Sequence, residues 1–267
     1  MGLERVKVNA VVLAGGTNGP EMAAATGVTN RALTPLGART MLDYVTSALH
    51  HAESVGDVFV VGDVPAGPHY EQIPGGASLL DNLLAGVRAA QTANTRILVS
   101  TSDIPFLMPE AVEDFIRQAH SPGAVSADLC CSYVPLARCR ERFPEMKRTA
   151  IKLREGRFTL GNLMLVNPQF LEAHRDIITR AYDARKSAVG VARLLGAGLP
   201  ARLLLAQCVS PSLLTVPALE EGVSRLIGGG RVAAIRSEYP EVGTDVDKPD
   251  DVAVARRMLA GGPPALA

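Results

Sequence analysis

The sequence predicts an α/β fold in which helices cover both faces of a mostly parallel β-sheet, with a helical insertion. Three observations lead to this prediction. Apolar runs of strand length alternate with amphipathic runs of helix length. Two glycines, Gly15 and Gly16, follow the first apolar run, and Asp103 follows the third. Open α/β sheets bind ligands at the carboxyl ends of their strands, so these residues mark a candidate site.

Six short and mostly apolar segments are expected to form buried strands. They are 8–14, 57–62, 96–101, 128–134, 162–167 and 231–236. Three segments with apolar residues at helical spacing are expected to form helices, at 41–49, 78–87 and 109–119. Ser78 and Asp81 have the spacing of a capping box at the start of the second helix. Strands that alternate with helices favour parallel pairing, with both sheet faces covered.

The segment from about 170 to 230 departs from this alternation. Its pattern is helical and it contains several Arg and Lys residues, so we expect a helical subdomain packed beside the sheet. We therefore interpret 1–260 as a single domain that includes this subdomain. Residues 261–267 begin with Gly-Gly-Pro-Pro and are expected to be a flexible tail.

Charge and composition exclude several classes of function. The 267 residues include 27 basic and 27 acidic side chains, so no net charge attracts nucleic acid or an anionic membrane. Aromatic residues make up only 4%, which argues against a stacking platform for single-stranded nucleic acid. The four cysteines form no Cys-x-x-Cys pair, which argues against a zinc site. With no evident signal peptide and no apolar run of the roughly 18–20 residues that a membrane span needs, we expect a cytoplasmic protein.

The glycine turn at Gly15 and Gly16 is the first candidate for ligand binding. A buried strand followed by glycine exposes backbone N–H groups, which can hold phosphate. The same turn can also be an ordinary strand exit, and the residues alone leave both interpretations open. The turn is neither a dinucleotide fingerprint nor a P-loop, because Gly19 does not complete GxGxxG and no Gly-Lys-Ser/Thr follows.

Two acidic segments are the second candidate. Asp103 follows a strand-length run and should lie at the carboxyl edge of the sheet, although it could instead cap a helix ahead of Pro105. Asp245 and Asp247 alternate, so in an extended segment their carboxylates face the same side. Carboxylates in such a group can hold Mg²⁺ or Mn²⁺. The segment 249–251, Pro-Asp-Asp, is interpreted as the first turn of a helix.

Taken in order, these motifs resemble the nucleotidyltransferases of the molybdenum-cofactor guanylyltransferase (MobA-like) type and the related sugar-phosphate nucleotidyltransferases. The segments that carry the resemblance are 11–16, 31–37, 41–42, 103–107 and 245–251. The resemblance implies a three-layer Rossmann-like fold of the nucleotide-diphospho-sugar transferase (GT-A-like) kind. It also implies transfer of NMP from an NTP to a small, phosphorylated acceptor, with release of pyrophosphate.

The same resemblance assigns roles to individual residues. The expected catalytic residues are Arg31, Asp103 and Asp247. The expected ligands of Mg²⁺ or Mn²⁺ are Asp103 and Asp247, assisted by Asp245. The nucleotide is expected to contact Leu13, Ala14, Gly15, Gly16, Thr17, Gly76, Ser78 and Asn82. The acceptor is expected to contact Lys147, Arg148, Lys152, Gly161 and Asn162. From the residues alone, Ser78 can equally be a helix cap, and the basic residues can equally form a solvated surface.

The chain departs from the family pattern at two places that concern the triphosphate. The family loop continues Gly-x-Gly-x-Arg-Met, whereas residues 16–22 read Gly-Thr-Asn-Gly-Pro-Glu-Met and lack the arginine. The family lysine is replaced by Arg31, which keeps the charge and presents a planar fork to phosphate. Two other functions stay open, a nucleotide-sugar-dependent glycosyltransferase and a non-catalytic nucleotide-binding protein. The expected partners are an NTP and a small-molecule acceptor, without nucleic acid or membrane, and a homodimer is left open.

Overall fold

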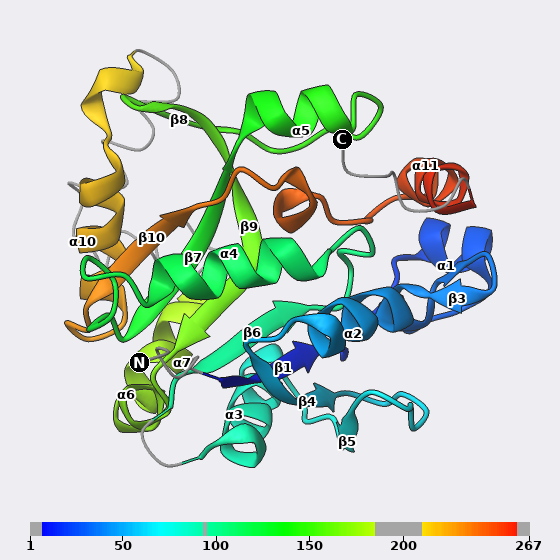
Figure 1. The fold of residues 1–267 in the computed structure, drawn as a ribbon, viewed down its shortest axis with the longest axis horizontal. Helices are drawn as coiled ribbons and strands as arrows, with labels where there is room; N and C mark the ends of the chain where they lie inside the picture. Colours follow the sequence, from blue (N-terminus) through cyan, green and yellow to red (C-terminus); the bar gives the residue numbers. More distant parts are fainter. Residues whose placement is uncertain (1–6, 93–94, 185–209, 261–267) are drawn as a thin grey trace, which may run out of the picture.

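The computed structural model describes residues 7–92, 95–184 and 210–260, and Figure 1 shows their arrangement. The described residues form one mixed sheet of eight strands. The strand order in the sheet is β10-β7-β9-β6-β1-β4-β5, and β8 pairs with β9. The strands are β1 (Val8–Leu13), β4 (Val55–Val61), β5 (Glu71–Ile73), β6 (Ile97–Thr101), β7 (Leu129–Pro135), β8 (Ile151–Leu153), β9 (Gly156–Val166) and β10 (Val232–Arg236).

The strand pairing is mostly parallel, as the sequence predicted. β1 pairs in parallel with β4 and β6, β4 with β5, and β10 with β7. β9 is antiparallel to β6, β7 and β8. The hairpin between β8 and β9 accounts for the pairing of these two strands, because a hairpin joins antiparallel strands, whereas parallel neighbours need a crossover.

Helices cover both faces of the sheet, so the three-layer prediction is confirmed. The helices α2 (Met41–His51) and α4 (Pro109–Ala119) contribute side chains to a core that contains Val8, Ala10 and Val12 of β1. The helices α3 (Leu79–Ala90) and α6 (Pro168–Ala173) contribute to a second core that contains Val11 and Leu13. Because successive side chains of a strand point to opposite faces, one apolar run serves both cores.

The predicted elements form with small shifts in their bounds. All three predicted helices are present, and five of the six strands begin within two residues of the expected position. The exception is β9, which begins at Gly156 instead of 162. The first half of β9 was not predicted from the sequence. Exposed Arg157 and Leu160 and the pair Gly161-Asn162 interrupt the apolar pattern there.

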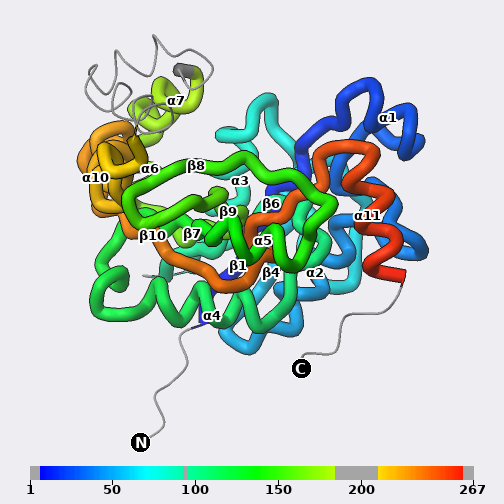
Figure 2. Tube along the Cα trace, turned by 90° about the horizontal axis from the view of Figure 1, so that it is seen from above, coloured from blue at the N-terminus to red at the C-terminus, as the bar shows by residue number. Residues whose placement is uncertain are grey.

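Short elements that the sequence did not predict lie along the carboxyl edge of the sheet. They are α1 (Pro20–Thr26), η1 (Arg31–Leu33), the hairpin of β2 (Pro35–Leu36) and β3 (Arg39–Thr40), α5 (Leu136–Arg142) and η3 (Pro240–Gly243). The last helix, α11 (Pro249–Ala260), begins where the Pro-Asp-Asp segment predicted a helix start and lies beside α1, far from it in the sequence (Figure 2).

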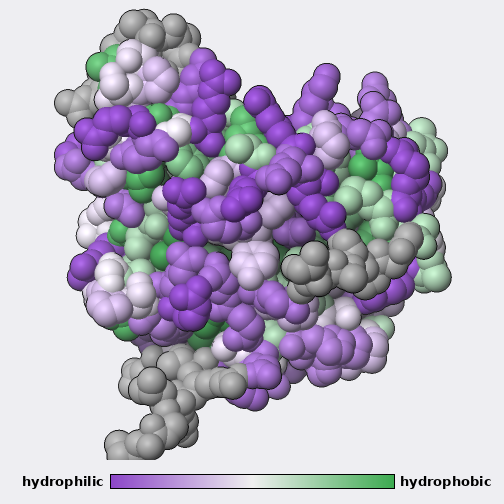
Figure 3. Space-filling model, turned by 45° about the horizontal axis from the view of Figure 1, so that its top comes forward, coloured by the Kyte–Doolittle hydropathy of each residue, from purple (hydrophilic) through white to green (hydrophobic). Residues whose placement is uncertain are grey.

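The described residues of the expected insertion at 170–230 are mostly helical. This span contains most of α6, α7 (Arg175–Ala184), η2 (Pro211–Leu213) and α10 (Val216–Leu226), and α10 packs on β10. Residues 185–209 and the expected tail at 261–267 lie outside the described residues. Polar side chains dominate the face of the molecule shown in Figure 3. None of the helices in the described ranges is long and apolar enough to cross a membrane.

Candidate active site

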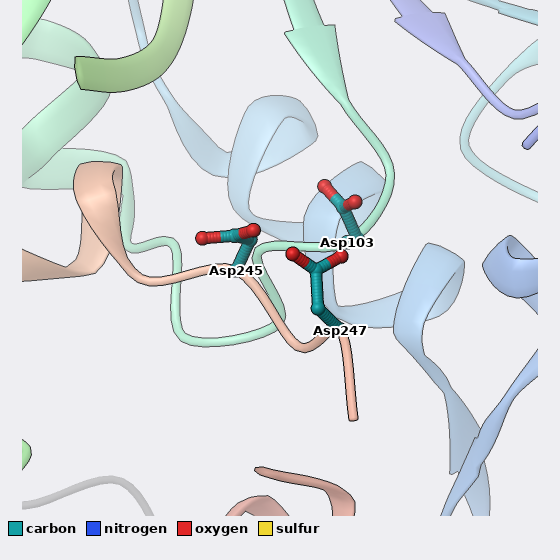
Figure 4. Close-up of side chains that lie close together, drawn as sticks. All are labelled: Asp103, Asp245 and Asp247. Carbon is teal, nitrogen blue, oxygen red and sulfur yellow. The ribbon is translucent and has the colours of Figure 1, made fainter. Parts of the chain in front are cut away.

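Three carboxylates meet at the carboxyl edge of the sheet (Figure 4). Asp103 follows the end of β6, and Asp245 and Asp247 lie in the extended segment after η3. The N–H of Val246 donates to the carbonyl oxygen of Asp103 at 2.8 Å, which joins the two segments. Val246 is fully buried, so its two neighbours turn the other way, and carboxylate oxygens of all three residues lie within 4.8 Å of one another. The predicted same-side arrangement of Asp245 and Asp247 is therefore confirmed.

Asp103 is not a helix cap. The next helix, α4, begins at Pro109, and its N-cap residue is Met108. The Oδ1 atom of Asp103 is buried and has no hydrogen-bond partner among the described residues. Buried polar atoms are normally paired, so this oxygen is available to a ligand.

Arg31 lies between the two acidic segments. Its Nη1 atom is 3.2 Å from Oδ2 of Asp103 and 2.5 Å from Oδ1 of Asp247. Its backbone N–H donates to the carbonyl oxygen of Gly16 at 2.9 Å. A single cationic residue therefore contacts both the acidic cluster and the glycine turn.

Arg148 forms a second, deeper connection within the cluster. Its guanidinium hydrogen-bonds Asp245 and lies 3.7 Å from Oδ2 of Asp251, with only 6% of the side chain exposed. The same oxygen of Asp251 accepts from the N–H groups of Asp247 and Lys248. Arg148 was expected to meet the acceptor, but the structure places it among the carboxylates, where it neutralises charge.

Burial raises the pKa of Asp245 to about 7. The hydrogen bond with Asp247 and the negative charges of Asp247 and Asp103 act in the same direction, and Arg148 opposes them. Because proximity of like charges disfavours ionisation, the cluster favours a cation among these oxygens.

Asn30 holds the glycine turn in place, a role that the sequence did not suggest. Its Nδ2 atom donates to the carbonyl oxygens of Ala14 (3.1 Å) and Asp63 (3.0 Å). Its Oδ1 accepts from the N–H of Ala32 at 2.9 Å and so caps η1, the helical turn that begins with Arg31. An asparagine directly before a helical turn is the signal that could have identified it.

Asn82 connects the glycine turn to the loop before α3. It is buried, and its Oδ1 accepts from the N–H of Gly76 at 2.6 Å. A Cβ atom at Gly15 would lie 2.3 Å from Nδ2 of Asn82, so a larger residue there would displace the amide group of Asn82. Ser78 caps α3 by accepting from the N–H of Asp81. Asn82 and Ser78 thus have structural partners, and contact with a nucleotide stays a prediction.

The residues expected at the acceptor fall into two groups. Gly161 and Asn162 lie inside β9, where Asn162 donates to the carbonyl oxygen of Val242 at 3.1 Å and a Cβ at Gly161 would meet Ser132 Oγ at 2.2 Å. Asn162 therefore supports η3, which leads to Asp245, and Gly161 lets η3 approach closely, because a Cβ there would also lie 2.9 Å from Cγ1 of Val242. Lys147 is exposed in the loop after α5, and Lys152 lies in β8.

A divalent cation fits the residues present at this site. Three carboxylates converge, one buried carboxylate oxygen lacks a partner among the described residues, and all the potential donors are oxygens, which hard cations such as Mg²⁺ prefer. With the glycine turn beside the cluster, the fold and site define an α/β enzyme of the class that binds its ligands at the carboxyl edge of its sheet.

Comparisons with known proteins agree with this class. Residues 10–166 match the MobA-like NTP transferase domain. A hypothetical transferase from Thermus thermophilus is 33% identical, with a TM-score of 0.80, over 92% of this chain and 100% of that one. The fold is also similar to 2-C-methyl-D-erythritol 4-phosphate cytidylyltransferase from the same organism, at 17% identity and a TM-score of 0.52, over 94% and 98% of the two chains. It is similar as well to CMP:2-keto-3-deoxy-manno-octonic acid synthetase complexed with CTP, at 12% identity and a TM-score of 0.58, over 96% of this chain and 99% of that one. No curated protein matches the chain.

The chain therefore belongs to the MobA-like NTP transferase family. The resemblance seen in the sequence is confirmed, and so is the nucleotide-diphospho-sugar transferase type of fold. Its class of activity is nucleotidyl transfer from an NTP to a small acceptor.

Proposed function

We propose that the chain is a catalytically competent, Mg²⁺- or Mn²⁺-dependent nucleotidyltransferase that acts on a small phosphorylated acceptor in the cytoplasm. The observation that carries this proposal is the convergence of Asp103, Asp247 and Arg31 beside the glycine turn. These residues come from three separate parts of the chain, and each was assigned to catalysis by the family motifs.

The proposed reaction is in-line transfer at the α-phosphorus. An acceptor oxygen forms the new bond to phosphorus, the bond to the bridging oxygen breaks, and pyrophosphate leaves with that electron pair. The amides of residues 15–17 bind the triphosphate, and Arg31 stabilises charge that develops on pyrophosphate. When bound to Asp103 and Asp247, the metal ion would supply a Lewis acid for the α-phosphate. Positioning and electrostatics suffice, so no nucleophilic side chain is required.

Arg31 also supports competence despite the altered glycine loop. The family arginine is absent from residues 16–22, where α1 begins at Pro20. Arg31 is fixed by its backbone to Gly16, so its guanidinium is tethered next to the turn that would hold the triphosphate. A planar guanidinium suits phosphate oxygens, and it can supply the charge that the loop lacks.

The direct test is a pyrophosphate-release screen. Each of the four NTPs is combined with Mg²⁺ and a panel of phosphosugar, phospholactate, polyol phosphate and pterin acceptors. Asp103→Asn and Asp247→Asn should each abolish release, because asparagine keeps the shape but removes the charge that holds a hard cation. Asp250→Asn is the matched control, since Asp250 is exposed in the first turn of α11.

The screen also separates the alternatives. NTP binding with no pyrophosphate from any acceptor would support a non-catalytic nucleotide-binding protein. Hydrolysis of a nucleotide sugar without pyrophosphate release would support a glycosyltransferase. Full activity in both asparagine variants would contradict the proposed site.

A further inference from the structure

The acidic cluster is neutralised by two arginines that differ in their freedom to move. Arg148 pairs with Asp245 and Asp251, and 6% of its side chain is exposed. Arg31 pairs with Asp103 and Asp247, and 28% of its side chain is exposed. Withdrawing Arg148 would leave buried Asp251 and partly buried Asp245 without a counter-ion, whereas Arg31 can exchange its partners at the surface of the site.

The guanidinium of Arg31 occupies the position that a divalent cation requires. Its Nη1 atom contacts Asp103 Oδ2 and Asp247 Oδ1, so it lies between the two carboxylates expected to hold the metal. A cation between these carboxylates would lie within a few ångströms of the guanidinium, and like charges at that distance repel strongly. Metal and guanidinium therefore compete for one pair of carboxylates.

The guanidinium of Arg31 also has a second possible set of partners, at the glycine turn. Its backbone N–H is bonded to Gly16, and its Nε atom is buried without a hydrogen-bond partner within the described ranges. The side chain can thus turn about a fixed backbone from the carboxylates towards the glycine turn. A triphosphate in that turn would give the guanidinium several anionic oxygens in exchange for two carboxylates.

We propose that Arg31 is the resident counter-ion of Asp103 and Asp247 and moves to the triphosphate when the metal enters. This inference rests on the proposed function, because it assumes a metal and a triphosphate at this site. Its consequence is positive coupling: metal alone binds weakly because it must displace Arg31, and triphosphate strengthens metal binding by taking Arg31 away. By linkage, the metal strengthens triphosphate binding by the same factor.

The experiment measures Mn²⁺ affinity by electron paramagnetic resonance, with and without inorganic tripolyphosphate. Tripolyphosphate removes the need to know the nucleobase, and its solution affinity for Mn²⁺ is measured in parallel and subtracted. The proteins are the wild type, Arg31→Gln, Arg31→Lys and the control Arg39→Gln. Arg39 is exposed and bonds to the carbonyl oxygen of Asp43, away from the cluster. Circular dichroism confirms that each variant is folded.

For Arg31→Gln we expect Mn²⁺ alone to bind about tenfold more tightly than in the wild type, and tripolyphosphate to strengthen it less. Arg31→Lys keeps the charge and should retain weak binding and coupling, as should Arg39→Gln. If Arg31→Gln binds Mn²⁺ no more tightly while the wild type binds Mn²⁺ with tripolyphosphate, the exchange is refuted and the proposed function stands. If no protein binds Mn²⁺ even with tripolyphosphate, the proposed function fails and this inference fails with it.

Discussion

Replacing Arg148 with methionine should destabilise the protein strongly, although Arg148 lies beside the candidate active site. Its side chain is 6% exposed and neutralises Asp245 and Asp251, and only 10% of the Asp251 side chain is exposed. Methionine has a similar length and no charge, so both carboxylates lose their counter-ion inside the protein. Removing one partner of a buried ion pair costs about 3–5 kcal/mol, and we expect a loss near the lower end because Asp245 retains some contact with water.

The free energy of unfolding is measured by urea denaturation in EDTA at pH 8 and at pH 6. With Arg148 present the pKa of Asp245 is about 7, so at pH 8 the wild-type carboxyl group is charged and its pair with Arg148 is complete. Removing Arg148 raises the pKa of Asp245 further, so the loss of stability should be largest at pH 8. At pH 6 the group can hold a proton, and the loss should be smaller. The double variant Arg148→Met/Asp245→Asn should recover part of the lost stability at pH 8, because one unpaired charge is gone.

The matched control is Arg88→Met. Arg88 donates to both carboxylate oxygens of Glu172, but both side chains are 52% exposed, and surface pairs contribute little. If Arg148→Met loses no more stability than Arg88→Met, the buried charge network does not hold the cluster together. A loss that is the same at both pH values would show that Asp245 does not respond to the missing charge.

Three further outcomes test other parts of the site. Asp251→Ala should lower the free energy of unfolding by about 1–2 kcal/mol, because Oδ2 of this residue accepts from two N–H groups directly before α11. Urea denaturation measures the loss, and an unchanged midpoint would contradict this capping role. Since the folded pKa of Asp245 is raised from 3.8 to about 7, the folded state holds a proton that the unfolded state releases. This residue should therefore make stability fall as pH rises from about 4 to 7, and Asp245→Asn should flatten that part of the pH profile measured by thermal melting without metal. Gly15→Ala should weaken NTP binding measured by calorimetry, because its Cβ would lie 2.3 Å from Nδ2 of Asn82, whereas Gly19→Ala, with open space around it, should bind NTP like the wild type.

The sequence predicted the parts of the site that depend on local pattern. The run 8–14 predicted a buried strand, and the glycines after it predicted a turn at the carboxyl edge of the sheet. The alternation of Asp245 and Asp247 predicted that their carboxylates share a side, which the burial of Val246 confirms. These features follow from strand periodicity, which any reader of the sequence can apply.

Other features could not be predicted because they depend on contacts between distant residues. Asn30 joins Ala14 and Asp63, and nothing in the local sequence of an asparagine reveals which carbonyl groups will come near it. The antiparallel pairing of β9 with β8 depends on a hairpin whose apolar pattern is broken by polar and glycine residues.

Arg148 shows the difference most clearly. In the sequence it stands among other basic residues, so an exposed position that meets an anionic acceptor was a reasonable interpretation. The fold brings it to Asp245, 97 residues away in the sequence, in a buried position between two carboxylates. The sequence by itself determined which charges the protein carries and that Asp103 lies beyond the end of a strand. Only the tertiary structure decided which charges neutralise one another, because a buried charge needs an opposite charge nearby, and the folding of distant segments selects that neighbour.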